Sequence, residues 1–336
     1  MVALYITSSE KGSGKTAIGA ALGKHWLADG RKIGFFKPII ADSEHQPAEG
    51  ADGDAAFMKD LFALDEPIDL LCPVFSGVGS LTSRLKEAYA RVSEGKAVVM
   101  VEGISEPPHA SGDIVAALAA RVIIVEDFSK ELPKAMNSDK DWGGSLLGVV
   151  WNKVPRSRLE PVRGEMSTRL AQAGVNILGV LPEDRALFTL TIGELAERIQ
   201  GELLSGAEKS AELVENFMLE AKGVDPGPYY FARKANKAVV VSSQRPDMQL
   251  AALETSTRCL VLTGDTTPNP YVRHQAEAKD VPIILARGDT TATVTSIEEA
   301  LGKTRFRGEN KLAKLTEIME EHFNFPAVDK GLGLAS

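Results

Sequence analysis

A short loop near the amino terminus, Ser9-Glu-Lys-Gly-Ser-Gly-Lys-Thr16, constrains this chain most. It follows an apolar run at 3–6 that predicts a buried strand. It precedes a segment in which Ile18, Leu22 and Trp26 recur with the spacing of a helix. A strand, a glycine-rich loop and a helix in this order are the context of a phosphate-binding P-loop. We therefore expect an α/β fold whose ligand lies at the carboxyl ends of parallel strands.

The residues of this loop have separate expected roles. Gly12 and Gly14 let backbone N–H groups turn inward around phosphate oxygens. Lys15 can reach the β- and γ-phosphates, and the Thr16 hydroxyl can ligate Mg²⁺. Ser9 stands where the pattern usually has its first glycine, and a chance Gly-Lys-Thr in a strand–helix turn is the alternative. The expected cofactors are ATP and Mg²⁺, and the expected nucleotide contacts within the loop are Glu10, Lys11, Gly12, Ser13, Gly14, Lys15 and Thr16.

Two further charges follow predicted strands. Glu102 ends the apolar run 98–101, where an acid would hold Mg²⁺ or its water. Lys37 follows the run 33–36 and would place a second cation over the γ-phosphate, although a solvated lysine at a strand end is the alternative. For Asp54, the sequence alone favours a helix N-cap.

The order of the predicted elements indicates two domains. Strands and helices alternate over about the first two hundred residues, which predicts a P-loop NTPase-type parallel sheet with helices on both faces. A polar segment at 201–220, expected to be helical, and a Pro/Gly cluster at 223–228 separate it from a second, smaller α/β domain. The expected boundaries are 1–205 for the P-loop domain, 206–326 for the second domain and 327–336 for a flexible tail.

Composition excludes several kinds of partner. The chain has 336 residues, with 38 Lys and Arg against 46 Asp and Glu, a formal net charge of −8 that argues against nucleic acid as a partner. Its two cysteines, Cys72 and Cys259, are too few for a disulfide framework and favour a reducing, cytoplasmic setting. No apolar run has the length of a membrane span, and no cleavable leader is expected.

The first two hundred residues resemble dethiobiotin synthetase and its relatives, which include the amino-terminal part of long phosphotransacetylases and the ATP-binding part of cobyrinic acid a,c-diamide synthase. The resemblance rests on the loop, Lys37-Pro38, Asp54, the run 98–103 and the run 149–153. It implies that Glu10 lies near the metal and that Asp54 and Glu102 bind it together with Thr16. It also implies that Asn152 recognises the base, that Lys15 and Lys37 are the catalytic residues, and that the protein forms a homodimer.

Two departures narrow this resemblance. Ile104–Pro108 replaces the glycine-rich run of dethiobiotin synthetase, which disfavours its biotin-precursor substrate. Neither cysteine has the setting of a nucleophile, so a glutamine amidotransferase is not expected.

Residues 207–325 resemble a DRTGG domain, whose naming motif is degenerate here at Ser243–Asp247. A P-loop domain followed by a DRTGG domain matches the front end of long phosphotransacetylases. Because the acyl-transferring domain is not present before Ser336, phosphotransacetylase activity is not expected.

Two functions stay open at this point. One is an ATP-dependent ligase or ATPase of the dethiobiotin synthetase class, with phosphoryl transfer to a carboxylate or hydrolysis. The other is a regulatory nucleotide sensor with little turnover, whose second domain binds a small-molecule ligand or mediates assembly. The amount of ATP turnover separates them.

Overall fold

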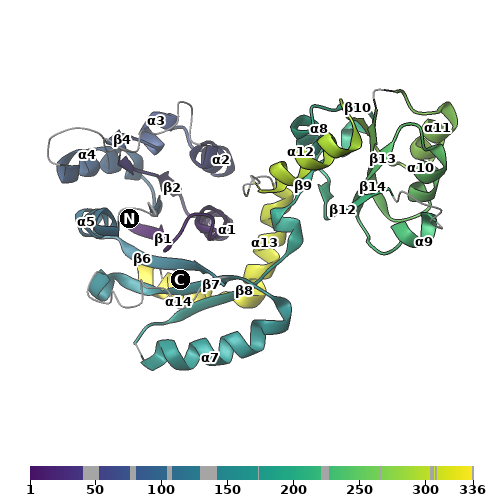
Figure 1. The fold of residues 1–336 in the computed structure, drawn as a ribbon. Coiled ribbons are helices and arrows are strands. Elements are labelled where there is room, and N and C mark those ends of the chain that lie inside the picture. Colours follow the sequence, from purple (N-terminus) through teal and green to yellow (C-terminus); the bar gives the residue numbers. More distant parts are fainter. Residues whose placement is uncertain are drawn as a thin grey trace. The chain divides into compact units, whose positions relative to one another are not determined.

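The computed structural model describes residues 1–40, 53–75, 81–103, 108–128, 142–172, 174–220, 227–264, 266–302, 306 and 309–334. The chain divides into two compact units (Figure 1). Unit 1 comprises Met1–Glu183 together with Leu315–Ser336, and unit 2 comprises Asp184–Lys314. This division differs from the boundaries expected at 205 and 326.

The core of unit 1 is a parallel sheet in the order β2-β5-β1-β6-β7-β8. Its strands are almost wholly buried, which explains why they read as continuous apolar runs. The phosphate-loop strand β1 lies between β5 and β6. The strands are β1 Val2–Thr7, β2 Ile33–Phe36, β5 Val98–Glu102, β6 Arg121–Asp127, β7 Leu146–Val154 and β8 Ile177–Pro182, with β3 Ile39–Ile40 and β4 Val74–Phe75 forming a separate parallel pair.

Helices cover both faces of this sheet, as expected; α1 and α4 lie on opposite sides of it (Figure 1). Helix α1 buries Ile18, Leu22 and Trp26, the residues whose spacing predicted it. A Cβ at Gly23 would collide with Phe62 and Met100, so α1 depends on a bare backbone there to approach β5. The helices are α1 Lys15–Ala28, α2 Gly53–Leu61, α3 Ile68–Leu71, α4 Leu81–Ser93, α5 Pro108–Leu118, α7 Leu159–Gln172, the part of α13 Glu309–His322 from Leu315 onward, and α14 Phe325–Leu332.

The carboxyl-terminal segment was expected to be a flexible tail, but most of it is the helix α14. Asn324 caps this helix by accepting a hydrogen bond from Ala327 N, and Gly333 ends it in the left-handed conformation. Asp329 accepts a hydrogen bond at 2.7 Å from the indole N–H of Trp26 on α1. The segment is ordered because it completes the packing of unit 1.

Unit 2 has a sheet in the order β10-β15-β14-β13-β12. Only β10 runs antiparallel to its neighbour; the other described pairs are parallel. The strands are β10 Glu202–Ser205, β12 Asn216–Leu219, β13 Lys237–Ser242, β14 Thr257–Thr263 and β15 Ile283–Leu285, with β9 Leu190–Thr191 and β11 Leu213–Val214 as an antiparallel pair. The helices are α8 Ile192–Arg198, α9 Gly227–Phe231, α10 Pro246–Leu253, α11 Pro270–Ala278, α12 Thr290–Gly302 and the first residues of α13.

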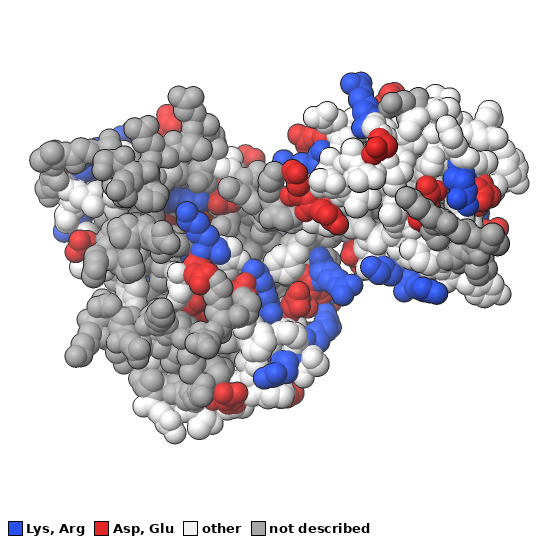
Figure 2. Space-filling model, in the orientation of Figure 1, with Lys and Arg blue, Asp and Glu red and all other residues white. Residues whose placement is uncertain are grey.

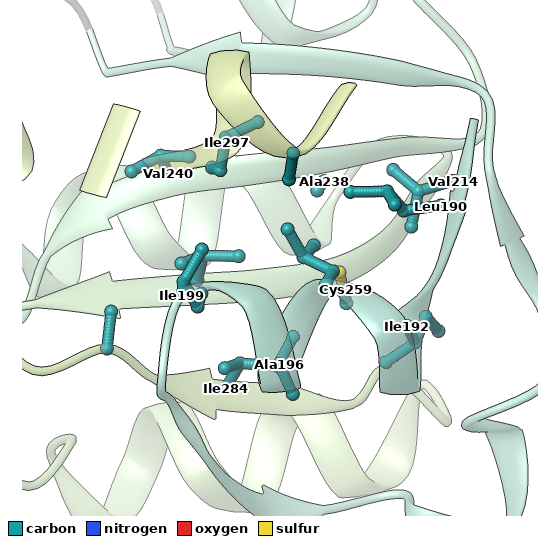
Figure 3. Close-up of a cluster of buried hydrophobic side chains, with 14 residues drawn as sticks. Leu190, Ile192, Ala196, Ile199, Val214, Ala238, Val240, Cys259, Ile284 and Ile297 are labelled. Atoms are coloured by element: carbon teal, nitrogen blue, oxygen red, sulfur yellow. The ribbon is translucent and has the colours of Figure 1, made fainter. Parts of the chain in front are cut away.

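The prediction of a helix at 201–220 was wrong. That segment forms β10, β11 and β12, because each of these short strands pairs with a strand distant in sequence. Such pairing is a tertiary effect that local periodicity does not reveal. The central strands bury alternate residues on opposite faces: Val240 and Val261 belong to the cluster in Figure 3, and their neighbours on the other face belong to a second cluster.

No helix among the described residues is long and apolar enough to cross a membrane. On the face drawn in Figure 2, the described Lys and Arg side chains are interspersed with Asp and Glu.

Candidate functional site

The phosphate loop joins β1 to α1 as the sequence predicted. Gly12 and Gly14 both have positive φ, 81° and 104°, so glycine is needed at each position. Gly14 immediately precedes α1, which directs the helix amino terminus at the loop. Lys15 Nζ donates to Ser8 Oγ at 2.7 Å, so its side chain folds back over the loop.

A network of charges at the carboxyl ends of β2 and β5 faces this loop. The Thr16 hydroxyl donates to Glu102 Oε2 at 2.9 Å. Lys37 Nζ lies 2.9 Å from Glu102 Oε1 and 2.8 Å from Asp54 Oδ2. Asp54 lies in the first turn of α2 and not at the N-cap position that the sequence alone favoured. Its carboxylate accepts a hydrogen bond from Lys37. Thr16, Lys37, Asp54 and Glu102 are therefore brought together.

Burial shifts the proton affinities of this network. Burial raises the pKa of Glu102, and the nearby Lys37 opposes that shift. Burial also lowers the pKa of Lys15, and the positive charge of Lys37 lowers it further against the attraction of Glu102. The charges of Lys37 and Glu102 therefore act on Lys15 in opposite directions.

The donor set fits a hard cation such as Mg²⁺. Thr16, Asp54 and Glu102 offer a hydroxyl and two carboxylates, and Mg²⁺ prefers oxygen ligands with phosphate and water completing its shell. Among the described residues, no three His, Cys, Asp or Glu side chains form a metal-binding group. Glu10, which is exposed, therefore does not join Asp54 and Glu102 in a three-carboxylate cluster.

Asn152 was predicted to recognise a nucleotide base. Its amide nitrogen donates to Ser13 O at 2.8 Å, and its amide oxygen accepts from Lys153 N at 3.0 Å. A Cβ at Gly14 would collide with this amide. In this structure Asn152 thus contacts the phosphate loop itself, and base contact stays a prediction.

Sequence reasoning missed Glu126, the last residue but one of β6. Its Oε1 accepts hydrogen bonds from Ser9 N at 3.1 Å and from Ser9 Oγ at 2.7 Å. Burial raises the pKa of Glu126, and the bonds from Ser9 oppose that shift. The available signal was a Glu-Asp pair at the end of the predicted strand 122–125, next to β1 in the sheet.

Fold and site together define a P-loop α/β protein, an arrangement that fits nucleotide binding. The chain belongs to the AAA domain family, whose model matches residues 2–189, more than half of its length. A DRTGG domain model matches residues 194–300. The resemblance to a P-loop domain followed by a DRTGG domain is therefore confirmed.

Several similar proteins of known name are phosphate acetyltransferases. The protein from Synechocystis is 22% identical over 90% of this chain and 48% of its own length. That from Nitratidesulfovibrio vulgaris is 22% identical over 96% and 50%, and that from Pseudomonas aeruginosa is 24% identical over 97% and 51%. The chain thus spans about half the length of the curated relatives it matches.

Solved structures give weaker matches. MinD from Aquifex aeolicus covers 56% of this chain and 84% of its own at 17% identity, with a TM-score of 0.37. The CBS and DRTGG domains of a Clostridium perfringens pyrophosphatase, solved with diadenosine tetraphosphate, cover 46% and 72% at 12% identity, with a TM-score of 0.31.

These relatives correct one expectation. We expected an ATP-dependent ligase or ATPase of the dethiobiotin synthetase class, and not a phosphotransacetylase. Phosphate acetyltransferases match nearly the whole chain, so the named proteins that it resembles are phosphotransacetylases and not ligases of that class. The expectation relied on the acyl-transferring domain being absent before Ser336, whereas the match to these relatives extends over 90–99% of this chain.

Proposed function

We propose that this chain binds Mg-ATP at the phosphate loop and acts as a nucleotide sensor in phosphate acetyl transfer, the reaction for which its relatives are named. Lys15 and Thr16 at the start of α1, facing the Lys37–Glu102–Asp54 network, carry the proposal. Loop amides and the helix amino terminus suit phosphate oxygens, and the carboxylates suit the metal.

The residues expected to contact phosphate and metal each have a place in this proposal. Lys15 and Lys37 neutralise the terminal phosphates, and Thr16, Asp54 and Glu102 hold Mg²⁺ or its water. The backbone from Glu10 to Gly14 surrounds the phosphates. The bound ion supplies charge neutralisation to the triphosphate, and the sensor turns ATP over slowly.

Calorimetry with Mg-ATP tests the binding site. The wild-type chain is expected to bind, and Lys15→Ala is expected to weaken binding by about 10- to 100-fold, because it removes a charge-assisted contact to phosphate. Lys24→Ala is the matched control: it changes an exposed lysine on the same helix. No heat from wild-type protein with ATP or GTP would reject the proposal.

Acetyl phosphate formation from acetyl-CoA and phosphate tests the sensing role. The assay uses the protein purified from its natural source, at increasing Mg-ATP. We expect the rate to change several-fold with ATP in the wild-type protein and to stay constant in Lys15→Ala. A rate independent of ATP in both proteins, while calorimetry shows binding, contradicts the sensing role alone.

Assembly and the second ligand are further parts of the proposal. A homodimer follows from the family resemblance, and a small-molecule ligand is assigned to unit 2. Light scattering with and without Mg-ATP measures the mass in solution. A monomer at all working concentrations rejects the homodimer.

A further inference from the structure

Two pairs of adjacent residues lie near the carboxyl ends of β6 and β7 and contact the phosphate loop or one another. They are Glu126-Asp127 and Asn152-Lys153. The sheet register sets Asp127 beside Asn152. We propose that these residues form a loop clamp that holds the phosphate loop in its nucleotide-binding shape, with Glu126 and Lys153 as positioning residues. This inference rests on the proposed function.

Glu126 fixes the first residue of the loop. The parallel register of β1 and β6 sets Thr7 beside Ile124, and continuing it sets Ser9 beside Glu126. One carboxylate oxygen accepts from both the backbone and the hydroxyl of Ser9, and Glu126 is only 4% exposed. A glycine at position 9 could donate only its backbone N–H. The serine that departs from the usual pattern therefore adds a second contact to the buried carboxyl group of Glu126.

Lys153 fixes the middle of the loop. Its Nζ donates to Gly12 O and to Asp127 Oδ2, each at 2.7 Å. Lys153 has a φ of 58°, in the left-handed region that a residue with a side chain rarely occupies. Such strain persists only where the surroundings require it, and it often accompanies functional sites.

Asn152 fixes the next carbonyl. Its amide donates to Ser13 O, and Gly14 leaves the space that this amide occupies. On the other side of the loop, the Ser8 hydroxyl donates to Glu10 O at 2.6 Å. Side chains thus hold the carbonyl oxygens of Glu10, Gly12 and Ser13.

This arrangement matters because a backbone nest binds an anion only when its N–H groups converge on it. Carbonyl oxygens that are held by hydrogen bonds elsewhere cannot rotate toward the phosphate. The loop clamp therefore fixes the binding shape before the nucleotide arrives, which reduces the ordering cost of binding. Its residues act through the loop without needing to touch the nucleotide.

The test combines amide hydrogen exchange with calorimetry on the full chain. In Lys153→Met and Glu126→Ala, amides of residues 9–14 are expected to exchange about 10-fold faster without nucleotide, and Mg-ATP is expected to bind about 10-fold more weakly. Glu126→Gln, which keeps an acceptor for Ser9, is expected to recover part of both losses. Glu183→Ala is the control: it changes an exposed acid just after β8, in the same sheet.

Ser9→Gly keeps the test decisive if Glu126→Ala does not fold, since Ser9 is exposed. Ser9→Gly removes the hydroxyl contact with Glu126. Glu126→Gln should therefore reduce the affinity for Mg-ATP less in the Ser9→Gly protein than in the wild type. Unchanged loop exchange and unchanged Mg-ATP affinity in Lys153→Met and Ser9→Gly would overturn the loop clamp while nucleotide binding stands. If the wild-type chain binds no nucleotide, the proposed function fails. The loop clamp is then judged by hydrogen exchange alone, since faster loop exchange in the variants would still support it.

Discussion

Lys37 and Glu102 form a close ion pair at the centre of the site, with 2.9 Å between Nζ and Oε1. Asp54 lies 2.8 Å from the same ammonium group. One lysine thus balances two carboxylates, one of which is buried, in the place where the proposed metal would need both.

Lys37→Met is expected to destabilise unit 1 by about 3 kcal/mol, because removing one partner leaves buried carboxylate charge uncompensated. Mg²⁺ without nucleotide is expected to restore part of that loss by occupying the space between Asp54 and Glu102. Urea unfolding with and without Mg²⁺ measures both effects. The double variant Lys37→Met, Glu102→Gln should regain stability without metal, and equal stability of Lys37→Met and wild type would contradict this account.

The affinity for Mg-ATP is expected to fall at alkaline pH. Burial lowers the pKa of Lys15 below its usual 10.5, so this ammonium loses its charge earlier than an exposed lysine would. Binding should then weaken as the pH rises through that lowered pKa, and calorimetry between pH 7 and roughly 10 follows it. Lys15→Ala should bind weakly with a flatter pH profile; an identical slope in both proteins would assign the effect to another group.

Gly14→Ala is expected to weaken Mg-ATP binding more than Gly12→Ala. Both changes place a side chain at positive φ, which costs about 1–2 kcal/mol. Only at Gly14 would the new Cβ also displace the Asn152 amide. At Gly12 no heavy atom beyond the adjacent residues lies within 4 Å of a Cβ. Comparing the two affinities isolates the contact with Asn152, and a larger loss for Gly12→Ala would argue against it.

The stability of unit 2 is expected to rise between about pH 8 and 10. Burial lowers the pKa of Lys237 to about 8, although its Nζ donates to Thr255 Oγ1 and Ser256 O. In that range the unfolded chain binds more protons than the folded one, so the free energy of unfolding increases with pH. Urea unfolding should show this slope in wild type and in Lys234→Met, an exposed control, and lose it in Lys237→Met.

The strand–loop–helix unit and the convergence of Thr16, Lys37 and Glu102 could be predicted because parallel strands bring their carboxyl ends to one edge. The contact of Glu126 with Ser9 could not, since it depends on which strand neighbours β1 and in what register. Contacts of this kind join residues far apart in sequence. The sequence carries the start and stop signals of α14, which are Asn324 before Pro326 and Gly333 after Leu332. Only the contact with Trp26 explains why this helix is stable in unit 1.

The pairing of Trp26 with Asp329 also constrains how this molecule is made. Because Leu315–Ser336 belongs to unit 1, unit 2 is an insertion within it. During synthesis the indole N–H of Trp26 lacks this acceptor until Asp329 has left the ribosome. Unit 2 is contiguous and can assemble before Leu315–Ser336 is made, so unit 1 is begun before unit 2 and completed after it.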